Sequence, residues 1–279
     1  MDFDDAYANA AYIPGAAAYP ERWRQNAAEF RDGLLSAGQA ELDITYGQST
    51  RSRLDLFLPD KAPRGLLIFV HGGYWLKFDK SYWSHLAAGP LHHGWAVAMP
   101  SYDLCPEVTI AQITRQIVQA VICAAGRVDG GLVLSGHSAG GHLVARMLAP
   151  GMLPNAVMQR VQRVVPISPV ADLRPLLQTA MNAQFGMDAA QAAAESPVLQ
   201  QAPKLPVTVW VGAEERPVFL DQARWLVEAW QTDPERPDPE RPDLEQTDVG
   251  HVVSPGQHHF NVIEDMAHAQ SALNTALFA

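Results

Sequence analysis

The clearest candidate for a reactive side chain in this sequence is a serine flanked by glycines. Ser138 lies in the stretch Gly136-His137-Ser138-Ala139-Gly140-Gly141, which follows the apolar run 132–134 and precedes an apolar helical pattern over 143–148. A tight turn between strand and helix projects the serine hydroxyl above the sheet, and small residues two positions away let neighbouring backbones approach. We therefore predict that Ser138 is a nucleophile. Capping of the helix is the simpler alternative role, but a cap does not need glycines on both sides.

Two further glycines offer backbone donors for a developing negative charge. Gly72 and Gly73 follow the buried run 66–70 within the stretch His71-Gly72-Gly73-Tyr74-Trp75. Acyl transfer places negative charge on an oxygen, and amide N–H groups aimed at that oxygen stabilise the transition state. We predict an oxyanion hole formed by Gly72, Gly73 and Ala139. We expect His71 to brace this loop by hydrogen bonding rather than to act as a base or a metal ligand.

The general base is expected near the end of the chain. His258 and His259 lie in a loop beyond the last predicted strand, within Gly256-Gln257-His258-His259-Phe260. This position suits a chain order of nucleophile, acid and histidine. We favour His259, because residues 260–267 are expected to begin a helix that holds the adjacent imidazole on a rigid support. His258 remains the alternative.

The acid that orients the imidazole is expected after a neighbouring strand. Glu215 follows the apolar run 207–211, and a carboxylate there can accept from the imidazole N–H and stabilise the imidazolium. Glu214 and Asp172 are the alternatives. Asp172 follows the run 161–167, from which an acid could also reach, although it is equally suited to cap a helix that begins near Leu173.

The order of the elements predicts how these side chains come together. Short apolar runs alternate with helical patterns, which indicates a mostly parallel, doubly wound α/β sheet buried on both faces. Residues 42–46 and 54–58 alternate between apolar and polar side chains and predict an antiparallel hairpin. Amphipathic helices are expected over 21–35 and 110–121. The buried runs are 66–70, 95–99, 132–134, 161–167 and 207–211.

We expect a single domain over residues 1–279, with two departures from the alternating pattern. Residues 172–203 lack a strand signal and carry alanine-rich helical stretches, so a small helical cap inserted over a pocket is expected there. Residues 233–243 contain two copies of Asp-Pro-Glu-Arg-Pro, whose prolines prevent both helix and strand pairing. We expect an exposed, mobile loop over about 232–244, a neutral surface expansion rather than a motif that binds a partner.

Composition bounds the remaining function classes. The 279 residues include 30 acidic and 20 basic side chains, and the net charge of −10 argues against binding to nucleic acid or a membrane surface. Apolar runs fall far short of the roughly 18 residues of a spanning helix, and the acidic N-terminus is unlike a secretory signal. Cys105 and Cys123 are too few for a disulfide framework, so we expect buried thiols and a cytoplasmic protein. The histidines, including His92 and His93, lack metal-ligand spacing. We therefore expect a small-molecule substrate, no cofactor and no metal, with homodimer formation left open.

These motifs together resemble the α/β-hydrolase family, in particular its His-Gly-Gly branch of kynurenine formamidases and hormone-sensitive-lipase-like esterases. The resemblance spans most of the chain and implies the α/β-hydrolase fold, with a sheet of about eight strands. It also implies a serine hydrolase that cleaves an aryl formamide such as N-formylkynurenine to the free amine and formate, with Ser138, Glu215 and His259 as triad. The stretches that carry it are His71-Gly72-Gly73-Tyr74-Trp75, Tyr102-Asp103-Leu104-Cys105-Pro106-Glu107, Gly136-His137-Ser138-Ala139-Gly140-Gly141-His142-Leu143, Asp172-Leu173-Arg174-Pro175-Leu176 and His259-Phe260.

The substrate is the part that the motifs leave open. A carboxylesterase or thioesterase on small acyl substrates would share every catalytic part, and a non-catalytic binding module on the same fold is the third alternative. A formyl group is small, so a formamidase must recognise the leaving amine. We expect Tyr74, Trp75 and residues 181–185 of the cap to form the apolar walls that do so.

Overall fold

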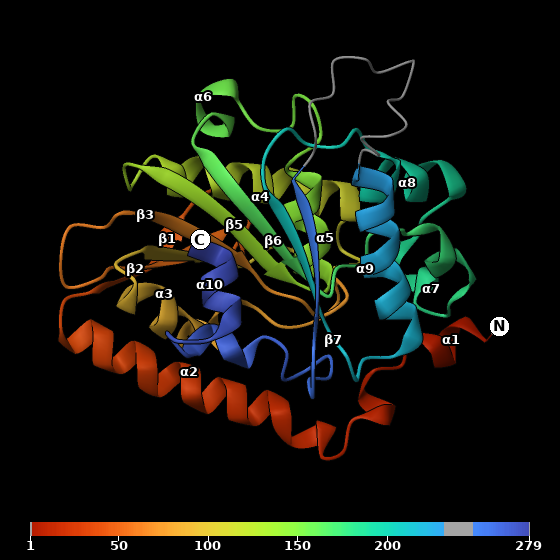
Figure 1. Cartoon of the computed structure of the whole chain (residues 1–279), viewed down its shortest axis with the longest axis horizontal. Helices are drawn as coiled ribbons and strands as arrows, with labels where there is room; N and C mark the ends of the chain where they lie inside the picture. The colour runs from red at the N-terminus through yellow and green to blue at the C-terminus, as the bar shows by residue number, and fades with distance from the viewer. Residues whose placement is uncertain (1, 232–247, 279) are drawn as a thin grey trace.

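The computed structural model describes residues 2–231 and 248–278, and these residues contain an eight-stranded sheet (Figure 1). The strand order is β1-β2-β4-β3-β5-β6-β7-β8, and all pairs from β4 to β8 are parallel. The α/β-hydrolase sheet expected from the sequence is confirmed. The strands are β1 (Ala40–Thr45), β2 (Arg53–Phe57), β3 (Gly65–Val70), β4 (Ala96–Pro100), β5 (Gly131–His137), β6 (Val161–Ile167), β7 (Val207–Gly212) and β8 (Val249–Ser254).

The predicted hairpin is confirmed and lies at one edge of the sheet. Strands β1 and β2 pair antiparallel, and β2 pairs antiparallel with β4. The central pair is β3 and β5, with Val70 opposite Gly136 at the carboxyl ends. The chain runs outward on both sides of this pair, so the loops after β3 and β5 lie side by side at the switch point, where α/β sheets bind ligands.

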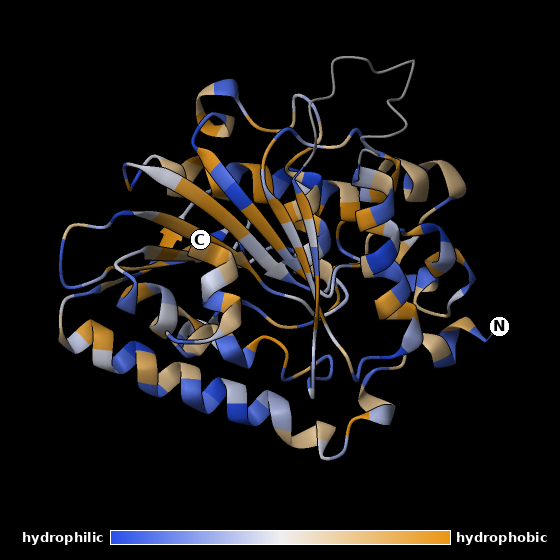
Figure 2. Ribbon diagram, viewed as in Figure 1, coloured by the Kyte–Doolittle hydropathy of each residue, from blue (hydrophilic) through white to orange (hydrophobic). Residues whose placement is uncertain are grey.

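Both faces of the sheet are covered by helices, because alternate residues of each central strand enter opposite halves of the core. In β3, Leu66, Ile68 and Val70 belong to one hydrophobic cluster, whereas Leu67 and Phe69 belong to the other. Figure 2 shows the resulting apolar strands. The first cluster packs under α4 (Ile110–Ala125), α5 (Ala139–Arg146) and α9 (Pro217–Trp230), the second under α2 (Tyr19–Ser36), α3 (Ala88–His92) and α10 (Ala272–Phe278).

Short helices occupy both the cap and the N-terminus. Residues 172–203, where a helical cap is predicted, contain η5 (Arg174–Gln178), α7 (Asn182–Phe185), α8 (Ala189–Ala194) and η6 (Pro197–Leu199). The N-terminal segment contains α1 (Phe3–Ala6), η1 (Ala10–Tyr12) and η2 (Ala16–Ala18) ahead of α2. The remaining short helices are η3 (Lys80–Tyr82), η4 (Ser84–Ala87), α6 (Asn155–Met158) and η7 (Glu264–Ala267).

One predicted helix is wrong. The chain after His259 makes turns and then the 3₁₀ helix η7, and an α-helix starts only at Ala272. Side chains compete with helical bonding here: Asn261 accepts from the amide of His258 at 2.7 Å, while Nδ1 of His258 accepts from the amide of Phe260 at 3.1 Å. The imidazole of His259 therefore lies on a turn that is held by side-chain-to-backbone hydrogen bonds.

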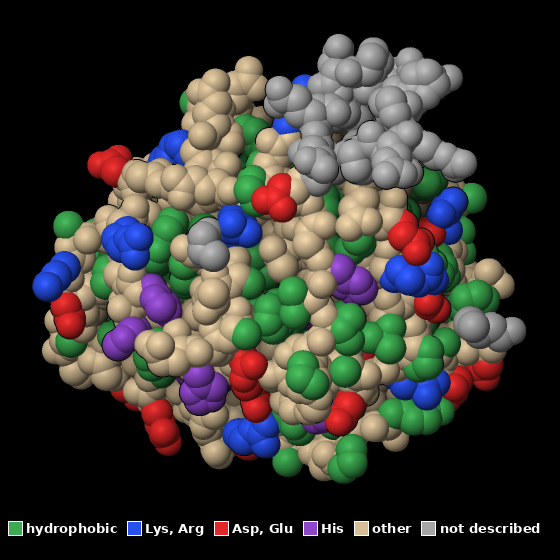
Figure 3. Space-filling view, viewed as in Figure 1, with side chains coloured by type: hydrophobic (Ala, Val, Ile, Leu, Met, Phe, Trp, Pro, Cys, Tyr) green, Lys and Arg blue, Asp and Glu red, His purple; other side chains and the backbone are tan. Residues whose placement is uncertain are grey.

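The remaining observations concern the thiols, the surface charges, membrane spans and the loop predicted over about 232–244. Cys105 is buried as expected, but Cys123 is only half-buried, and both thiols are free. Acidic and basic side chains are interspersed on the face drawn in Figure 3. No helix in the described parts of the chain is long and apolar enough to cross a bilayer. The predicted loop over about 232–244 lies outside the described residues.

Candidate active site

Ser138 occupies a strained turn between β5 and α5. Its φ of 56° and ψ of −115° are unusual for a residue with a side chain, and such strain persists only where the surroundings fix it. The amide of Ser138 donates to the carbonyl of Ile167 at 2.8 Å. A Cβ on Gly136 would lie 2.4 Å from the carbonyl of Gly140, and one on Gly140 only 1.9 Å from that of Val70. The flanking glycines are therefore required by close backbone contact, as the sequence indicated.

The loop after β3 brings Gly72 and Gly73 beside Ser138. A Cβ on Gly72 would lie 2.8 Å from the carbonyl oxygen of His137 and 3.1 Å from Cβ of Ser138, so the close approach of this loop to Ser138 requires a glycine. Gly73 has a φ of 109°, which L-residues rarely adopt. Within residues 2–231 and 248–278, no backbone carbonyl accepts from the amides of Gly72, Gly73 or Ala139. Three N–H donors close to the serine are thus without a backbone acceptor in the described residues.

The rest of this loop is also strained and is anchored on both sides. Tyr74 and Trp75 have φ values of 53° and 55°. The hydroxyl of Tyr74 donates to the carbonyl of Tyr7 at 2.8 Å, so the N-terminal segment holds the loop from outside. Trp75 is fully buried, with its ring 5.1 Å from His142 and 5.7 Å from Phe185. Tyr74 lines the pocket as expected. The expectation for Trp75 is corrected, because its indole fills the core behind the loop.

Glu215 and His259 form a buried pair after β7 and β8. Oε2 of Glu215 lies 2.6 Å from Nδ1 of His259. The other oxygen, Oε1, accepts from the amide of Gly212 at 2.9 Å and from the hydroxyl of Ser168. The carboxylate is thus held by three donors, which lie at the end of β7, after β6 and after β8. The sequence did not indicate Ser168. This residue follows β6 directly, has a φ of 46°, and donates its hydroxyl hydrogen bond to the Glu215 carboxylate.

The alternative acids and base lie in other environments. Asp172 is bound by the guanidinium of Arg174 at 2.6 Å, and Glu214 is exposed. Nε2 of His258 lies 3.1 Å from the hydroxyl of Tyr19. Of the residues that the sequence left open, the structure brings Glu215 and His259 together.

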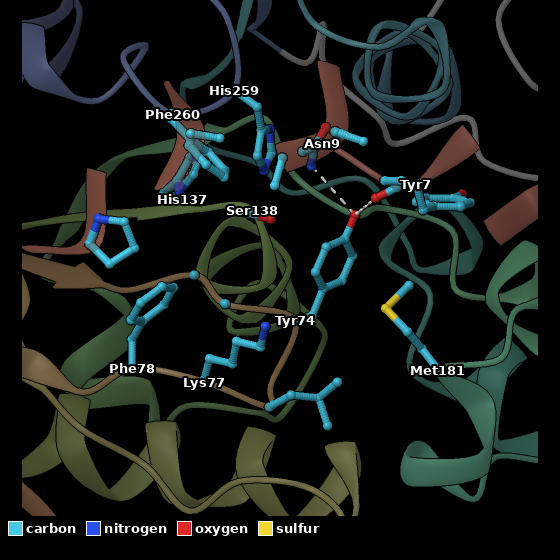
Figure 4. A pocket seen from close by; sticks show the side chains of 18 of the residues that line it. Tyr7, Asn9, Tyr74, Lys77, Phe78, His137, Ser138, Met181, His259 and Phe260 are labelled. Carbon is cyan, nitrogen blue, oxygen red and sulfur yellow. Dashed lines mark hydrogen bonds between the residues drawn. The ribbon is translucent and has the colours of Figure 1, made fainter. Parts of the chain in front are cut away.

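A cavity of about 820 Å³ opens over these residues. Ser138 and His259 both line it, together with Gly72 and Gly73 (Figure 4). Met181 and Gln184 of the cap reach it, whereas Phe185 is buried in the core. The wall that sequence reasoning missed is N-terminal, and no periodic pattern marks it. The other lining residues are Asp4, Tyr7, Ala8, Asn9, Ala10, Ala11, Ala16, Ala17, Pro20, Trp23, Tyr74, Leu76, Lys77, Phe78, Trp83, His137 and Phe260.

Two histidines beside Ser138 are kept neutral by burial. Burial lowers the pKa of His71 to about 4, although its Nδ1 donates to the carbonyl of Gly72 at 2.8 Å. Its ring stacks on Tyr102 at 4.3 Å between ring centroids, and the Tyr102 hydroxyl donates to the His71 carbonyl. This is the loop-bracing role expected for His71. Burial and the neighbouring His259 hold the pKa of His137 well below its usual range.

The geometry supplies each part of an acyl-transfer site. A hydroxyl and an imidazole line one cavity, a buried carboxylate binds the far nitrogen of that imidazole, and amides without a backbone acceptor lie beside the hydroxyl. Among the residues that the structure describes, His, Cys, Asp and Glu form no cluster of three that could hold a metal ion.

Residues 67–272 match the model of the alpha/beta hydrolase family, which covers well over half of the chain. The chain belongs to this family, and it is a hydrolase. It is 29% identical to the kynurenine formamidase of Salmo salar over 241 residues, which are 82% of this chain and 77% of that protein. It is 30% identical to the kynurenine formamidase of Danio rerio over 67% of this chain and 68% of that protein.

Solved structures show the same fold. A crystal structure from Silicibacter sp. TM1040, described provisionally as a thioesterase, superposes with a TM-score of 0.92 at 57% identity and covers both chains fully. Esterase 2 of Thermogutta terrifontis superposes with a TM-score of 0.62 at 18% identity over 86% of this chain and 97% of that one. This second likeness concerns the fold alone.

Proposed function

We propose that this hydrolase uses Ser138 as the nucleophile of an acyl-enzyme mechanism and cleaves aryl formamides of the N-formylkynurenine type. His259 accepts the proton of the Ser138 hydroxyl as its oxygen attacks the formyl carbon. The resulting oxyanion accepts hydrogen bonds from the amides of Gly72, Gly73 and Ala139. Glu215 holds the imidazole in the required tautomer and stabilises its protonated form.

The remaining steps balance with one water molecule. The C–N bond breaks as the imidazolium of His259 gives its proton to the leaving amine. Water then attacks the formyl ester of Ser138 while His259 accepts one of its protons. The imidazolium returns that proton to the serine oxygen as the C–O bond breaks, and the formic acid released loses its proton to solvent to give formate. Every proton passes through the same imidazole nitrogen, the one opposite Glu215.

The observation that carries the mechanism is the pair Glu215 and His259, held at 2.6 Å beside the cavity that Ser138 lines. A buried carboxylate with three donors is a costly arrangement, and it fixes the direction of one imidazole. The substrate class is supported by the similarity to two kynurenine formamidases over 82% and 67% of the chain.

The shape of the cavity also suits an aromatic leaving group. Phe78, Trp83, Trp23 and Phe260 line it, and the ring centroids of Phe78 and Trp83 are 5.7 Å apart. Apolar aromatic walls bind a flat aryl amine through buried area and edge-to-face contact. A formyl group needs little room beside Ser138, so most of the cavity is available to the amine.

A thioesterase is the second candidate, because the Silicibacter relative at 57% identity carries that description. Turnover of N-formylkynurenine, p-nitrophenyl acetate and acetyl thioesters by the same enzyme separates the candidates. A kcat/KM for the formamide above that for the simple esters and thioesters supports the proposal. A clear preference for thioesters would replace it.

The role of Ser138 is tested by substitution and labelling. We expect Ser138→Ala to lower kcat by on the order of 10⁶ while the melting temperature is retained. A fluorophosphonate probe should label the native enzyme and the surface control Ser36→Ala, but not Ser138→Ala. A native enzyme that resists the probe would favour a non-catalytic binding module.

A further inference from the structure

One cationic side chain stands out in the candidate active site. Among the described residues that line the cavity, Lys77 is the only lysine or arginine. Its side chain is exposed and points into the cavity in Figure 4. The chain as a whole carries a net charge of −10, so the protein's general field repels an anionic substrate. An acidic group on a ligand would therefore meet one described cationic side chain in the cavity, that of Lys77.

The position of Lys77 is fixed by the loop after β3, residues 71–77, which contains the proposed oxyanion glycines and is called the oxyanion loop below. The carbonyl of Gly73 accepts from the amides of Leu76 and Lys77 at 3.0 and 3.1 Å, closing a turn that starts at the oxyanion glycine. The Lys77 carbonyl lies 2.5 Å from the place of a Cβ on Gly73. The backbone of Lys77 is thus part of the same hydrogen-bonded turn as Gly73, whereas its side chain can adopt other rotamers to contact a ligand.

The ammonium of Lys77 is available for a ligand. No ion pair links it to an acidic side chain in residues 2–231 or 248–278. The acidic lining residue, Asp4, already accepts from the amide of Ala180 in the cap at 2.7 Å. The other lysine of this region, Lys80, is in contrast buried and bound to Asp55 at 2.7 Å and Asp43 at 2.8 Å.

We propose that Lys77 is a specificity residue that selects substrates whose leaving group carries a carboxylate. This inference rests on the proposed acyl-transfer function. A formyl group offers no charge to recognise, so discrimination must come from the amine side, where aromatic walls bind the ring and one ammonium binds an acidic substituent. Lys77 makes its contact through a point charge and takes no part in proton transfer.

The test compares two aryl formamides, one with a carboxylate on the leaving amine and one without. For N-formylanthranilate, Lys77→Gln should lower kcat/KM by about 10- to 100-fold, the range for a hydrogen bond to a charged group. For formanilide, which lacks the carboxylate, kcat/KM should stay within about twofold. Lys77→Arg should retain the preference for the acidic substrate. Lys61→Gln, which removes an exposed lysine outside the cavity, is the matched control and should change neither substrate.

An ester pair separates this inference from the formamidase proposal. 4-Acetoxybenzoate and phenyl acetate also differ by a carboxylate on the leaving group. If the native enzyme cleaves the esters but neither formamide, the formamidase proposal fails, while loss of the acidic preference in Lys77→Gln still supports the role of Lys77. An equal effect of Lys77→Gln on acidic and neutral partners, or no effect on either, overturns it. If neither pair is cleaved, equal binding of anthranilate and aniline to the native protein in calorimetry overturns it as well.

Discussion

Nδ1 of His259 lies 2.6 Å from Oε2 of Glu215, with both side chains buried. The amide of Gly212 and the hydroxyl of Ser168 bind the other carboxylate oxygen, so Glu215 cannot rotate away from the imidazole. A carboxylate in this position keeps the proton on Nδ1 and leaves Nε2 to accept one. In the mechanism that we propose, Nε2 is the nitrogen that acts as the base.

Replacement of Glu215 should disable this base without unfolding the protein. We expect Glu215→Gln to lower kcat by roughly 10⁴, because an amide can present an N–H to Nδ1 and stabilise the wrong tautomer. The neighbouring Glu214→Gln is the control, since Glu214 is exposed. The measurement is kcat at saturating substrate. A loss in Glu214→Gln as large as that in Glu215→Gln would contradict the assignment.

Much of this site could be predicted because local chemistry constrains the sequence strongly. The glycines around Ser138 and at positions 72 and 73 are required because a Cβ added at any of them would lie 1.9 to 2.9 Å from a backbone oxygen, so they mark the turn in the sequence itself. The choice among Glu215, Glu214 and Asp172 could not be made in this way. All three follow strands, and only the guanidinium of Arg174, which binds Asp172, and the donors around Glu215 separate them.

Tertiary contacts decided the parts that sequence patterns did not predict. The N-terminal residues that line the cavity have no periodic apolar spacing, and the Tyr74 hydroxyl meets the Tyr7 carbonyl across 67 positions of chain. The burial of Trp75 depends on a left-handed backbone conformation that its residue type disfavours. The predicted helix after His259 does not form because the side chains of His258 and Asn261 accept hydrogen bonds from nearby backbone amides, in competition with helical bonding.

A pair of glycine substitutions tests the backbone crowding beneath Ser138. Gly140→Ala should lower the free energy of unfolding by more than about 3 kcal/mol or prevent folding, because its Cβ would lie 1.9 Å from the carbonyl of Val70. Gly33→Ala, in the last turn of α2 with nothing within 4 Å of the new Cβ, should raise it by about 0.5–1 kcal/mol. Urea unfolding measures both. Equal effects would show that the crowding near Val70 is relieved by small shifts.

The hydroxyl of Tyr74 should matter more for rate than for binding. Tyr74→Phe removes the 2.8 Å hydrogen bond to Tyr7 and releases the oxyanion loop on its outer side. We expect kcat to fall about 5- to 10-fold with KM nearly unchanged, as for a loss of about 1 kcal/mol in the transition state alone. Tyr12→Phe is the matched control, since its hydroxyl bonds Asp5 in the same segment and does not touch the loop. A rise in KM at constant kcat would instead assign Tyr74 to substrate binding.

Acid should destabilise the fold through its buried neutral histidines. Burial lowers the pKa of His142 to about 4, and its Nε2 donates to the carbonyl of Glu195 at 2.8 Å. The unfolded chain protonates this residue near pH 6.5. From pH 6.5 down to about 4 the unfolded state therefore binds the extra proton, and the free energy of unfolding falls as the pH is lowered.

The size of this effect follows from the width of the pH window. Each such histidine lowers the free energy of unfolding by about 1.4 kcal/mol for each pH unit below pH 6.5 within this window, and has no effect above it. Between pH 6.5 and pH 5, His142 therefore lowers the free energy of unfolding by about 2 kcal/mol. Urea unfolding at pH 7 and pH 5 should show a smaller difference in His142→Asn than in the native protein by about this amount. His92→Asn, at an exposed position, should leave the difference unchanged. An identical pH dependence in all three proteins would mean that His142 becomes protonated within the folded state.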